Sequence, residues 1–296
     1  MRKIILIFTI LIIYSNSYSQ HTIDESNDLP EKKEIPSVNK FRGAKFLEKP
    51  TIEMSYGISD IGIDGLSSEI SPSGMLELKL GYSTQRKSYY DKKSVLKYLS
   101  GFTFLSVAST DLNSNVKPVS ELNSETWRFG LGMKQGYGVE IGESAIMPYT
   151  SGAFVWSRFN LQGNPGSLSE TDLNLLSNFN ETFRFGTLSE SGINLQIVPL
   201  ITLQAKYERA IVFPRHLFTV QMGSMLIETV GAYMLGDFID NVMRNSPVLG
   251  TIVSFALKSG YSYGIYELRK SEMNWPFGGE APLSFNTYKV GMTFTF

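Results

Sequence analysis

The chain has 296 residues, 12% of them aromatic, and it contains no cysteine. The missing cysteines exclude disulfides, thiol catalysis and Cys-ligated metals. A formal net charge of −1 leaves no basic excess for binding nucleic acid, and the length suits one domain of barrel size or two small ones.

Residues 1–19 have the pattern of a secretory signal peptide. Met1-Arg2-Lys3 is a short basic start, residues 4–14 are apolar apart from Thr9, and Ser17-Tyr18-Ser19 is a small-residue ending. We expect cleavage before Gln20. An N-terminal membrane anchor is the weaker alternative, because the apolar run is shorter than the roughly 20 residues that a spanning helix needs.

Residues 20–49 are polar and contain Pro30 and Pro36, so we predict a flexible periplasmic lead-in without a core of its own. The folded domain is predicted at 50–296. Without Arg2 and Lys3, the exported chain carries 25 basic against 28 acidic side chains.

Period-two alternation of apolar and polar residues predicts β-strands along this domain. The longest alternation covers 126–141, where the odd positions from Trp127 to Ile141 are apolar except for Gln135. Strands of this length exceed the five or six residues usual in soluble proteins and suit the tilted crossing of a bilayer. Pro199 interrupts one predicted strand and marks a bulge or a turn. We predict eight strands, near 51–56, 76–82, 98–109, 126–141, 145–158, 180–188, 193–211 and 285–296.

The predicted connections alternate between short and long. Residues 142–144 and 189–192 have the composition of tight turns, whereas the long stretches are polar and rich in Asn, Ser and Gly. Short turns at one end and long loops at the other are typical of membrane barrels, with the short turns periplasmic. The long connections lie around 58–73, 110–124 and 159–178, and 85–97 is longer than this scheme expects.

A helical insertion is predicted at about 215–260. Apolar residues recur every three or four positions from Met225 to Val242, and Pro247 opens a second helix that Gly260 ends. Neither is expected to be a transmembrane helix, because charged side chains interrupt the first and the second is too short. We expect a cap or plug on the barrel end. The alternatives are a lumen-facing or interface element with a specific role, or two further strands, which would make ten.

The chain ends in an alternating strand, Tyr288-Lys289-Val290-Gly291-Met292-Thr293-Phe294-Thr295-Phe296. Together with the export signal, it resembles the closing strand of bacterial outer-membrane β-barrel proteins, the small OmpA-like and porin-type barrels. The resemblance implies an all-β, antiparallel transmembrane barrel in the outer membrane of a Gram-negative-type bacterium. It also implies contact with outer-membrane lipid and lipopolysaccharide, and recognition of Phe296 by the barrel-assembly machinery.

The inward-facing parity collects ionic side chains in the predicted lumen. The interior of an eight-stranded barrel is filled by side chains, so we expect these ions to pair into a network. The alternative is a narrow, weakly anion-favouring path, since bases outnumber acids. The candidate cluster is Glu77, Lys79, Arg128, Lys134, Glu140, Arg184, Lys206 and Glu208, and the same parity adds Glu53 and Lys289.

No catalytic residue, cofactor or metal site is predicted. Lipase and deacylase barrels resemble one another in placing a Ser two residues after the catalytic His, but that position after His216 is Phe218, and Ser224 lies further on. His21 is in the lead-in. The sequence therefore predicts a non-enzymatic barrel with an envelope structural or binding role and a filled or plugged lumen. A small-solute pore is the second hypothesis, and a lipid-modifying enzyme is the third.

Overall fold

The structure is a computed structural model, and it describes residues 49–90, 95–113, 122–162, 168–215 and 217–296. The predicted signal peptide (1–19) and the lead-in up to residue 48 lie outside the described residues. Lys49, the last residue of the predicted lead-in, is the first residue of the first strand.

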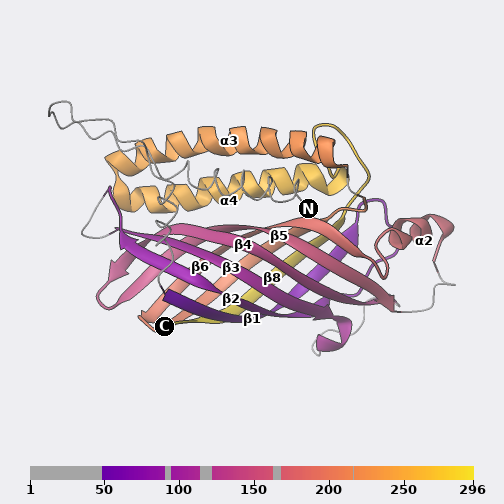
Figure 1. Cartoon of the computed structure of the whole chain (residues 1–296), viewed down its shortest axis with the longest axis horizontal. Coiled ribbons are helices and arrows are strands. Elements are labelled where there is room, and N and C mark those ends of the chain that lie inside the picture. The colour runs from indigo at the N-terminus through magenta and orange to yellow at the C-terminus, as the bar shows by residue number, and fades with distance from the viewer. Residues whose placement is uncertain (1–48, 91–94, 114–121, 163–167, 216) are drawn as a thin grey trace, which may run out of the picture. The chain divides into compact units, whose positions relative to one another are not determined.

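Eight antiparallel strands form a closed barrel in chain order, which confirms the predicted fold class and strand count (Figure 1). The first and last strands close it, with Ile52 opposite Phe294 and Ile63 opposite Leu283. Closure pairs both edges of the sheet, so among the described strands none has an open edge. The strands are β1 (Lys49–Ile63), β2 (Ser73–Lys87), β3 (Val95–Ser109), β4 (Asn123–Ile141), β5 (Ser144–Gln162), β6 (Phe183–Val198), β7 (Ile201–Val212) and β8 (Leu283–Thr295).

The predicted boundaries of β6 and β7 are wrong. The expected turn at 189–192 lies within β6, where Glu190 pairs with Ser151 on one side and Glu208 on the other. The chain instead turns at Pro199 and Leu200, between β6 and β7. The Ser-Glu-Ser-Gly segment has turn-like composition, but pairing with both neighbouring strands outweighs this local preference. Proline lacks an amide hydrogen and therefore suits the turn better than a central strand.

The two ends of the barrel differ. Residues 142–143 and 199–200 connect strands at one end, where Ser88, Tyr89, Tyr90 and Phe296 also lie; we call this the short-turn end. The other end, the loop end, holds the described residues 64–72, 110–113 and 168–182 of the connections, and also 213–215 and 272–282, which lead into and out of the helical insertion. They include the 3-10 turn η2 (Thr110–Leu112) and the helix α2 (Glu170–Ser177).

Alternation separates the two faces of the wall. Inward-facing side chains are largely buried, whereas the outer wall exposes large apolar side chains over much of its surface. Such an apolar outer band is the surface that membrane barrels present to lipid. Its residues include Ile52, Met54, Ile58, Leu76, Leu78, Leu80, Leu105, Trp127, Phe129, Leu131, Met133, Ile193, Leu195, Leu203 and Val290.

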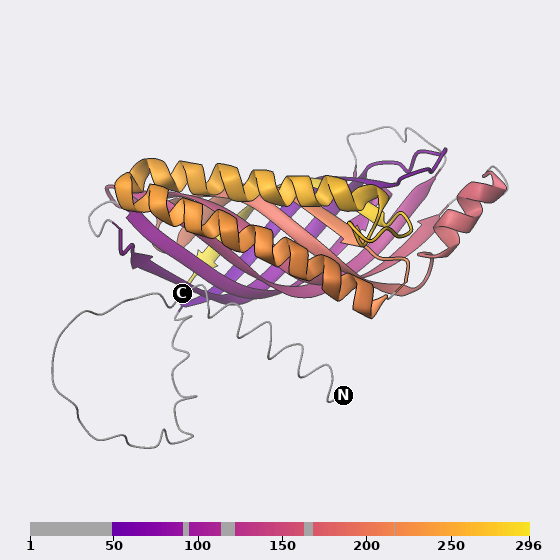
Figure 2. The same cartoon turned by 90° about the horizontal axis from the view of Figure 1, so that it is seen from above.

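The helical insertion is a hairpin of α3 (Phe218–Asn245) and α4 (Pro247–Ser271). Figures 1 and 2 show both helices running along the outside of the barrel. Near the short-turn end, Ile239 and Met243 pack with Val95, and near the loop end Tyr266 packs with Phe213. The predicted cap or plug on the barrel end is therefore wrong. No helix in the described part of the chain is both long and apolar enough to cross a membrane.

The second helix is longer than predicted because Gly260 does not end it. Glycine inside a helix costs only about 1 kcal/mol relative to alanine, and the packing of Tyr266 on the wall favours continuation of α4 to Ser271. The two helices are joined by an ion pair between Arg269 and Glu228, at 3.0 Å. The Tyr261 hydroxyl also donates to the Glu228 carbonyl at 2.7 Å.

A carboxylate joins two of the long connections at the loop end. Asp172 of α2 accepts a hydrogen bond from the Ser67 amide at 3.0 Å and another from the Ser68 hydroxyl at 2.8 Å. Ser169 caps the same helix by accepting from the Asp172 amide at 3.1 Å. The hydrogen bond from the Ser67 backbone, followed by that from Ser68, lowers the pKa of Asp172 below its usual value.

Gly130→Ala should destabilise the barrel by about 1–3 kcal/mol, because an added methyl group overpacks a closed site. A Cβ at Gly130 would lie 2.1 Å from the Phe154 carbonyl oxygen and 2.7 Å from the Phe104 ring. Urea unfolding of the refolded protein measures the effect. Gly152→Ala is the matched control, since a Cβ there meets nothing within 4 Å. Equal losses in both variants would contradict the packing argument.

Acid should loosen the contact between α2 and residues 67–68. A carboxyl group whose pKa is lowered in the folded state contributes stability above its unfolded pKa, about 3.9, and that contribution is lost as the pH falls through the lower folded value. Amide-exchange protection factors of Ser67 and α2, measured from pH 6 downward, report it. In Asp172→Asn, protection should already be reduced at pH 6 and should vary less with pH. Identical profiles would contradict this role.

Candidate functional site: a filled lumen

Nine ionic side chains project from the strands into the barrel and meet near its middle. We call this set the lumen network, and none of its members is more than 6% exposed. Alternation positions them, since each occupies an inward-facing place on its strand. The network comprises Glu53 of β1, Glu77 and Lys79 of β2, Arg128 and Lys134 of β4, Glu190 of β6, Lys206 and Glu208 of β7, and Lys289 of β8.

Lys289 lies among three of the four carboxylates. Its ammonium contacts Glu77 at 2.8 Å and Glu190 at 3.5 Å, and it also binds Glu208. Carboxylate oxygens of these three glutamates lie within 4.8 Å of one another, a grouping that could hold a metal ion. The Lys289 ammonium supplies the positive charge there, so the grouping is explained by ion pairing.

The remaining bases link the carboxylates across the lumen. Lys79 contacts Glu190 at 2.8 Å, and Lys134 contacts Glu53 at 2.7 Å. Lys206 bridges two glutamates, binding Glu53 and lying 3.2 Å from Glu77, and Arg128 pairs with Glu208. Every carboxylate of the network thus has at least two basic partners. That arrangement offsets the cost of burying these charges away from water.

Six of the eight candidate residues from the sequence lie in the network, and Glu140 and Arg184 do not. Glu140 pairs with the exposed Lys87 towards the short-turn end. Arg184 lies towards the loop end, where its Nε donates to the Asn178 carbonyl at 2.8 Å. Both keep the inward parity, but they stand near strand ends, where a side chain reaches solvent or a loop.

Glu190 is the network residue that sequence reasoning missed, because its segment was assigned to a turn. The signal that could have found it is alternation carried through the whole of β6. Leu188, Glu190 and Asn194 share its buried face, while Ile193 and Leu195 are exposed. Read in this way, Glu190 takes the inward parity and belongs with the other lumen charges.

An apolar cluster fills the lumen between the network and the loop end. Its Phe102 ring lies 4.7 Å from the Lys79 ammonium, and its Phe285 ring lies 5.3 Å from the Arg128 guanidinium. These cation–π contacts join the two layers. We call it the loop-end cluster: Ile61, Ile63, Ile70, Phe102, Phe104, Val155, Phe159, Leu176, Phe179, Leu188, Ala210, Val212, Leu283 and Phe285.

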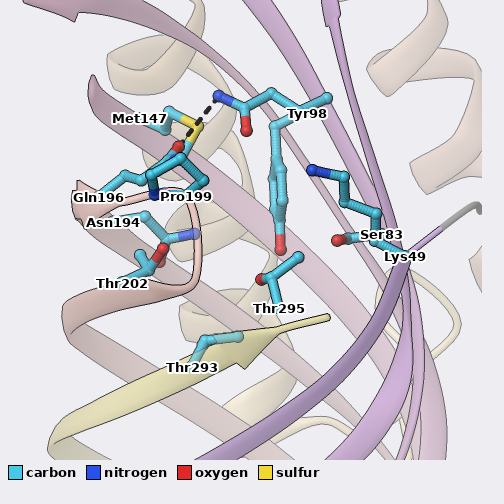
Figure 3. A pocket seen from close by; sticks show the side chains of 11 residues that line it. Lys49, Ser83, Tyr98, Met147, Asn194, Gln196, Pro199, Thr202, Thr293 and Thr295 are labelled. Atoms are coloured by element: carbon cyan, nitrogen blue, oxygen red, sulfur yellow. Dashed lines mark hydrogen bonds between the residues drawn. The ribbon is translucent and has the colours of Figure 1, made fainter. Parts of the chain in front are cut away.

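On its other side, the network borders a polar pocket that opens at the short-turn end (Figure 3). The pocket is small, and Tyr98 projects into it. Thr293 lines it and donates to Glu53 of the network at 3.4 Å. Across its mouth, Gln85 donates to Gln196 at 3.1 Å. The pocket therefore reaches the network from one end.

Ser224 is the serine that the enzyme hypothesis would pair with His216, and its hydrogen bonds in the structure connect helices. Its hydroxyl donates to the Trp275 carbonyl at 2.6 Å and accepts from Arg269 at 2.8 Å, and the residue is 3% exposed. These contacts tie α3 to α4 and to the segment leading into β8. His216, the other residue of that hypothesis, lies outside the described residues.

Lys289→Met should lower the free energy of unfolding by about 3–5 kcal/mol, because removal of one partner leaves buried carboxylates uncompensated. Methionine keeps much of the side-chain length, so loss of charge dominates the change. Denaturant unfolding of the refolded barrel in detergent or lipid measures it. Lys87→Met is the matched control, since the Lys87 side chain is 44% exposed and such surface pairs contribute only about 0–1 kcal/mol. Similar losses in both variants would contradict a stabilising network.

No family model matches the chain, and no curated protein matches it. Solved structures do: Neisserial surface protein A (NspA) is 10% identical, with 83% of this chain and 97% of that one covered and a TM-score of 0.41. Ail of Yersinia pestis, in complex with the heparin analogue sucrose octasulfate, is 9% identical over 84% and 98%, with a TM-score of 0.32. OprG of Pseudomonas aeruginosa is 11% identical over 84% and 97%, with a TM-score of 0.30. Similarities at this level of sequence identity and TM-score do not assign a function to this chain. Its own closed topology and apolar outer wall give it the architecture of an eight-stranded antiparallel β-barrel of the kind that spans membranes.

Proposed function

We propose that this chain is a non-enzymatic barrel of the outer membrane with a structural role in the envelope, and that its lumen does not conduct. The observation that carries the proposal is the filled lumen. The lumen network occupies the middle of the barrel, and the loop-end cluster fills the lumen between the network and the loop end. A barrel built in this way supplies a rigid wall that can anchor other elements.

The outer wall supports a bilayer location. Leu78 and Leu80 on β2 and Phe129 and Leu131 on β4 are 37–47% exposed, on a face where a soluble protein would place polar residues. The export pattern of residues 1–19 agrees with this location. The proposal extends to assembly, in which the terminal strand ending in Phe296 is the segment that the barrel-assembly machinery reads.

A solute pore is the competing function, and the polar pocket is the feature that favours it. A solute entering from the short-turn end would meet Thr293 and then Glu53, where Lys134 and Lys206 are already paired. Passage would require these ion pairs to separate and the rings of Phe102 and Phe285 to move. Five bases against four acids leave one excess positive charge in the network, which is weak support for an anion path.

The lipid-modifying enzyme is less well supported. A serine nucleophile needs an adjacent base and an accessible hydroxyl. The Ser224 hydroxyl is buried and held between Trp275 and Arg269, so its contacts favour a structural role.

The purified protein should give no discrete conductance steps in planar lipid bilayers, because the network and the loop-end cluster block the lumen. A general porin inserted under the same conditions is the positive control for the membrane. Heat-modifiable migration of the same preparation on a gel should verify that the barrel is folded. Reproducible unitary steps from folded protein would overturn the filled-lumen proposal and favour the pore.

A further inference from the structure

The hairpin of α3 and α4 covers the barrel wall from one end to the other. Met243 packs with Val95 near the short-turn end, and Tyr266 packs with Phe213 near the loop end. Figure 2 shows the two helices side by side along the strands. The 25 residues of α4 make a helix roughly 38 Å long, and the hydrocarbon core of a bilayer is about 30 Å thick. A hairpin in this position passes the full depth of the apolar band.

The hairpin face that points away from the barrel is apolar. Val230 and Ile252 are each 60% exposed, and Met234 is 68% exposed. In a water-soluble helix pair these positions would be expected to carry polar side chains. The exposed apolar side chains of this face are Leu226, Ile227, Val230, Tyr233, Met234, Phe238, Val248, Leu249, Ile252, Tyr263 and Leu268.

Several polar side chains of the hairpin lie towards its ends or against protein, and Asp237 is exposed on α3 three residues before Asp240. Asp240 accepts from the Tyr90 hydroxyl at 2.9 Å near the short-turn end, and Glu228 pairs with Arg269 towards the loop end. Midway along α4, Lys258 lines a small pocket between the helix and the wall, together with Thr251 and Ser254. The mean hydropathy of α4 includes these polar side chains, which the barrel covers. It therefore understates how apolar the outward face of the helix is.

The barrel wall covered by the hairpin carries an outward-facing arginine, whose exposure to lipid would be unfavourable. Arg209 of β7 has the outward parity but is 2% exposed. Its guanidinium lies 5.4 Å from the rings of both Tyr207 and Tyr263, the latter on α4. An arginine facing lipid is costly at the bilayer midplane and less costly near the interfaces. The hairpin shields this outward-facing arginine, with the Tyr263 ring beside its guanidinium.

We propose that the hairpin lies within the bilayer beside the barrel, with its apolar face against lipid acyl chains. The lipid band of the barrel and the outer face of the hairpin then form one continuous apolar surface. This inference rests on the proposed outer-membrane location, and it adds a helical element to the lipid-facing wall. Lipid is the occupant to which the geometry points, because the apolar face continues the apolar outer wall and most charged groups of the hairpin lie towards its ends or towards the barrel.

Single spin labels can test this placement, since the chain has no native cysteine. Val230→Cys and Ile252→Cys place a nitroxide on the outer face of the hairpin. Leu80→Cys places one on the uncovered wall of β2, and Glu143→Cys places one on the exposed short turn. The full-length variants are reconstituted in phosphatidylcholine–phosphatidylglycerol vesicles, and collision with oxygen and with a water-soluble nickel chelate is measured. All four positions are exposed, so the substitutions disturb no core packing, and heat-modifiable migration checks the fold.

Labels at 230 and 252 should collide with oxygen and be shielded from nickel, as at Leu80, with an oxygen-to-nickel ratio several-fold above that at Glu143. High nickel collision at 230 and 252 with a lipid-like Leu80 would overturn the inference while leaving the barrel in the membrane. Low collision with both reagents at 230 and 252 would mean that a protein covers the face, and would also overturn it. Water-like behaviour at Leu80 would overturn the proposed location and this inference together.

Discussion

The width of an eight-stranded barrel is the constraint on which the rest of the structure depends. Such a barrel has room inside only for side chains, so every inward position must fit beside its neighbours across the lumen. Glycines at close approaches, such as Gly130 against Phe104, make room for large side chains opposite. The lumen then divides into layers of different chemistry: the polar pocket, the lumen network and the loop-end cluster.

The lumen network follows from the same constraint. Buried charges need partners at short range, and the strands of a narrow barrel bring distant parts of the chain to within hydrogen-bond distance. Glu53 and Lys206 are far apart in sequence but bind one another, as do Arg128 and Glu208. Loss of one ion pair leaves a buried charge without a partner. The network therefore stabilises one register of all the β-strands that contribute to it.

The packing between the two helices of the hairpin resembles that of helices within membranes, which associate through close packing and polar contacts. Small residues let its two helices approach closely. A Cβ at Gly231 would lie 2.4 Å from the Tyr261 hydroxyl, and a Cβ at Gly250 would lie 2.5 Å from the Met243 sulfur. An ion pair and a hydrogen bond at Glu228 add polar contacts between the helices. These contacts lie between the two helices, and large apolar side chains such as Val230 and Ile252 are exposed on the outer face of the hairpin.

The predictable features of this chain are those set by local periodicity, and the others depend on contacts across long sequence distances. Alternation predicted the barrel, its eight strands and most of the lumen network, including Arg128 and Lys134 on β4. It failed at Glu190, where turn-like neighbours hid a strand that is stabilised by pairing on both sides. Helical spacing predicted the hairpin, but the spacing alone does not say which surface the helices cover. In the structure, the hairpin contacts the wall through Met243 against Val95, Tyr266 against Phe213, and Tyr263 near the outward-facing Arg209, and these contacts join residues far apart in the sequence.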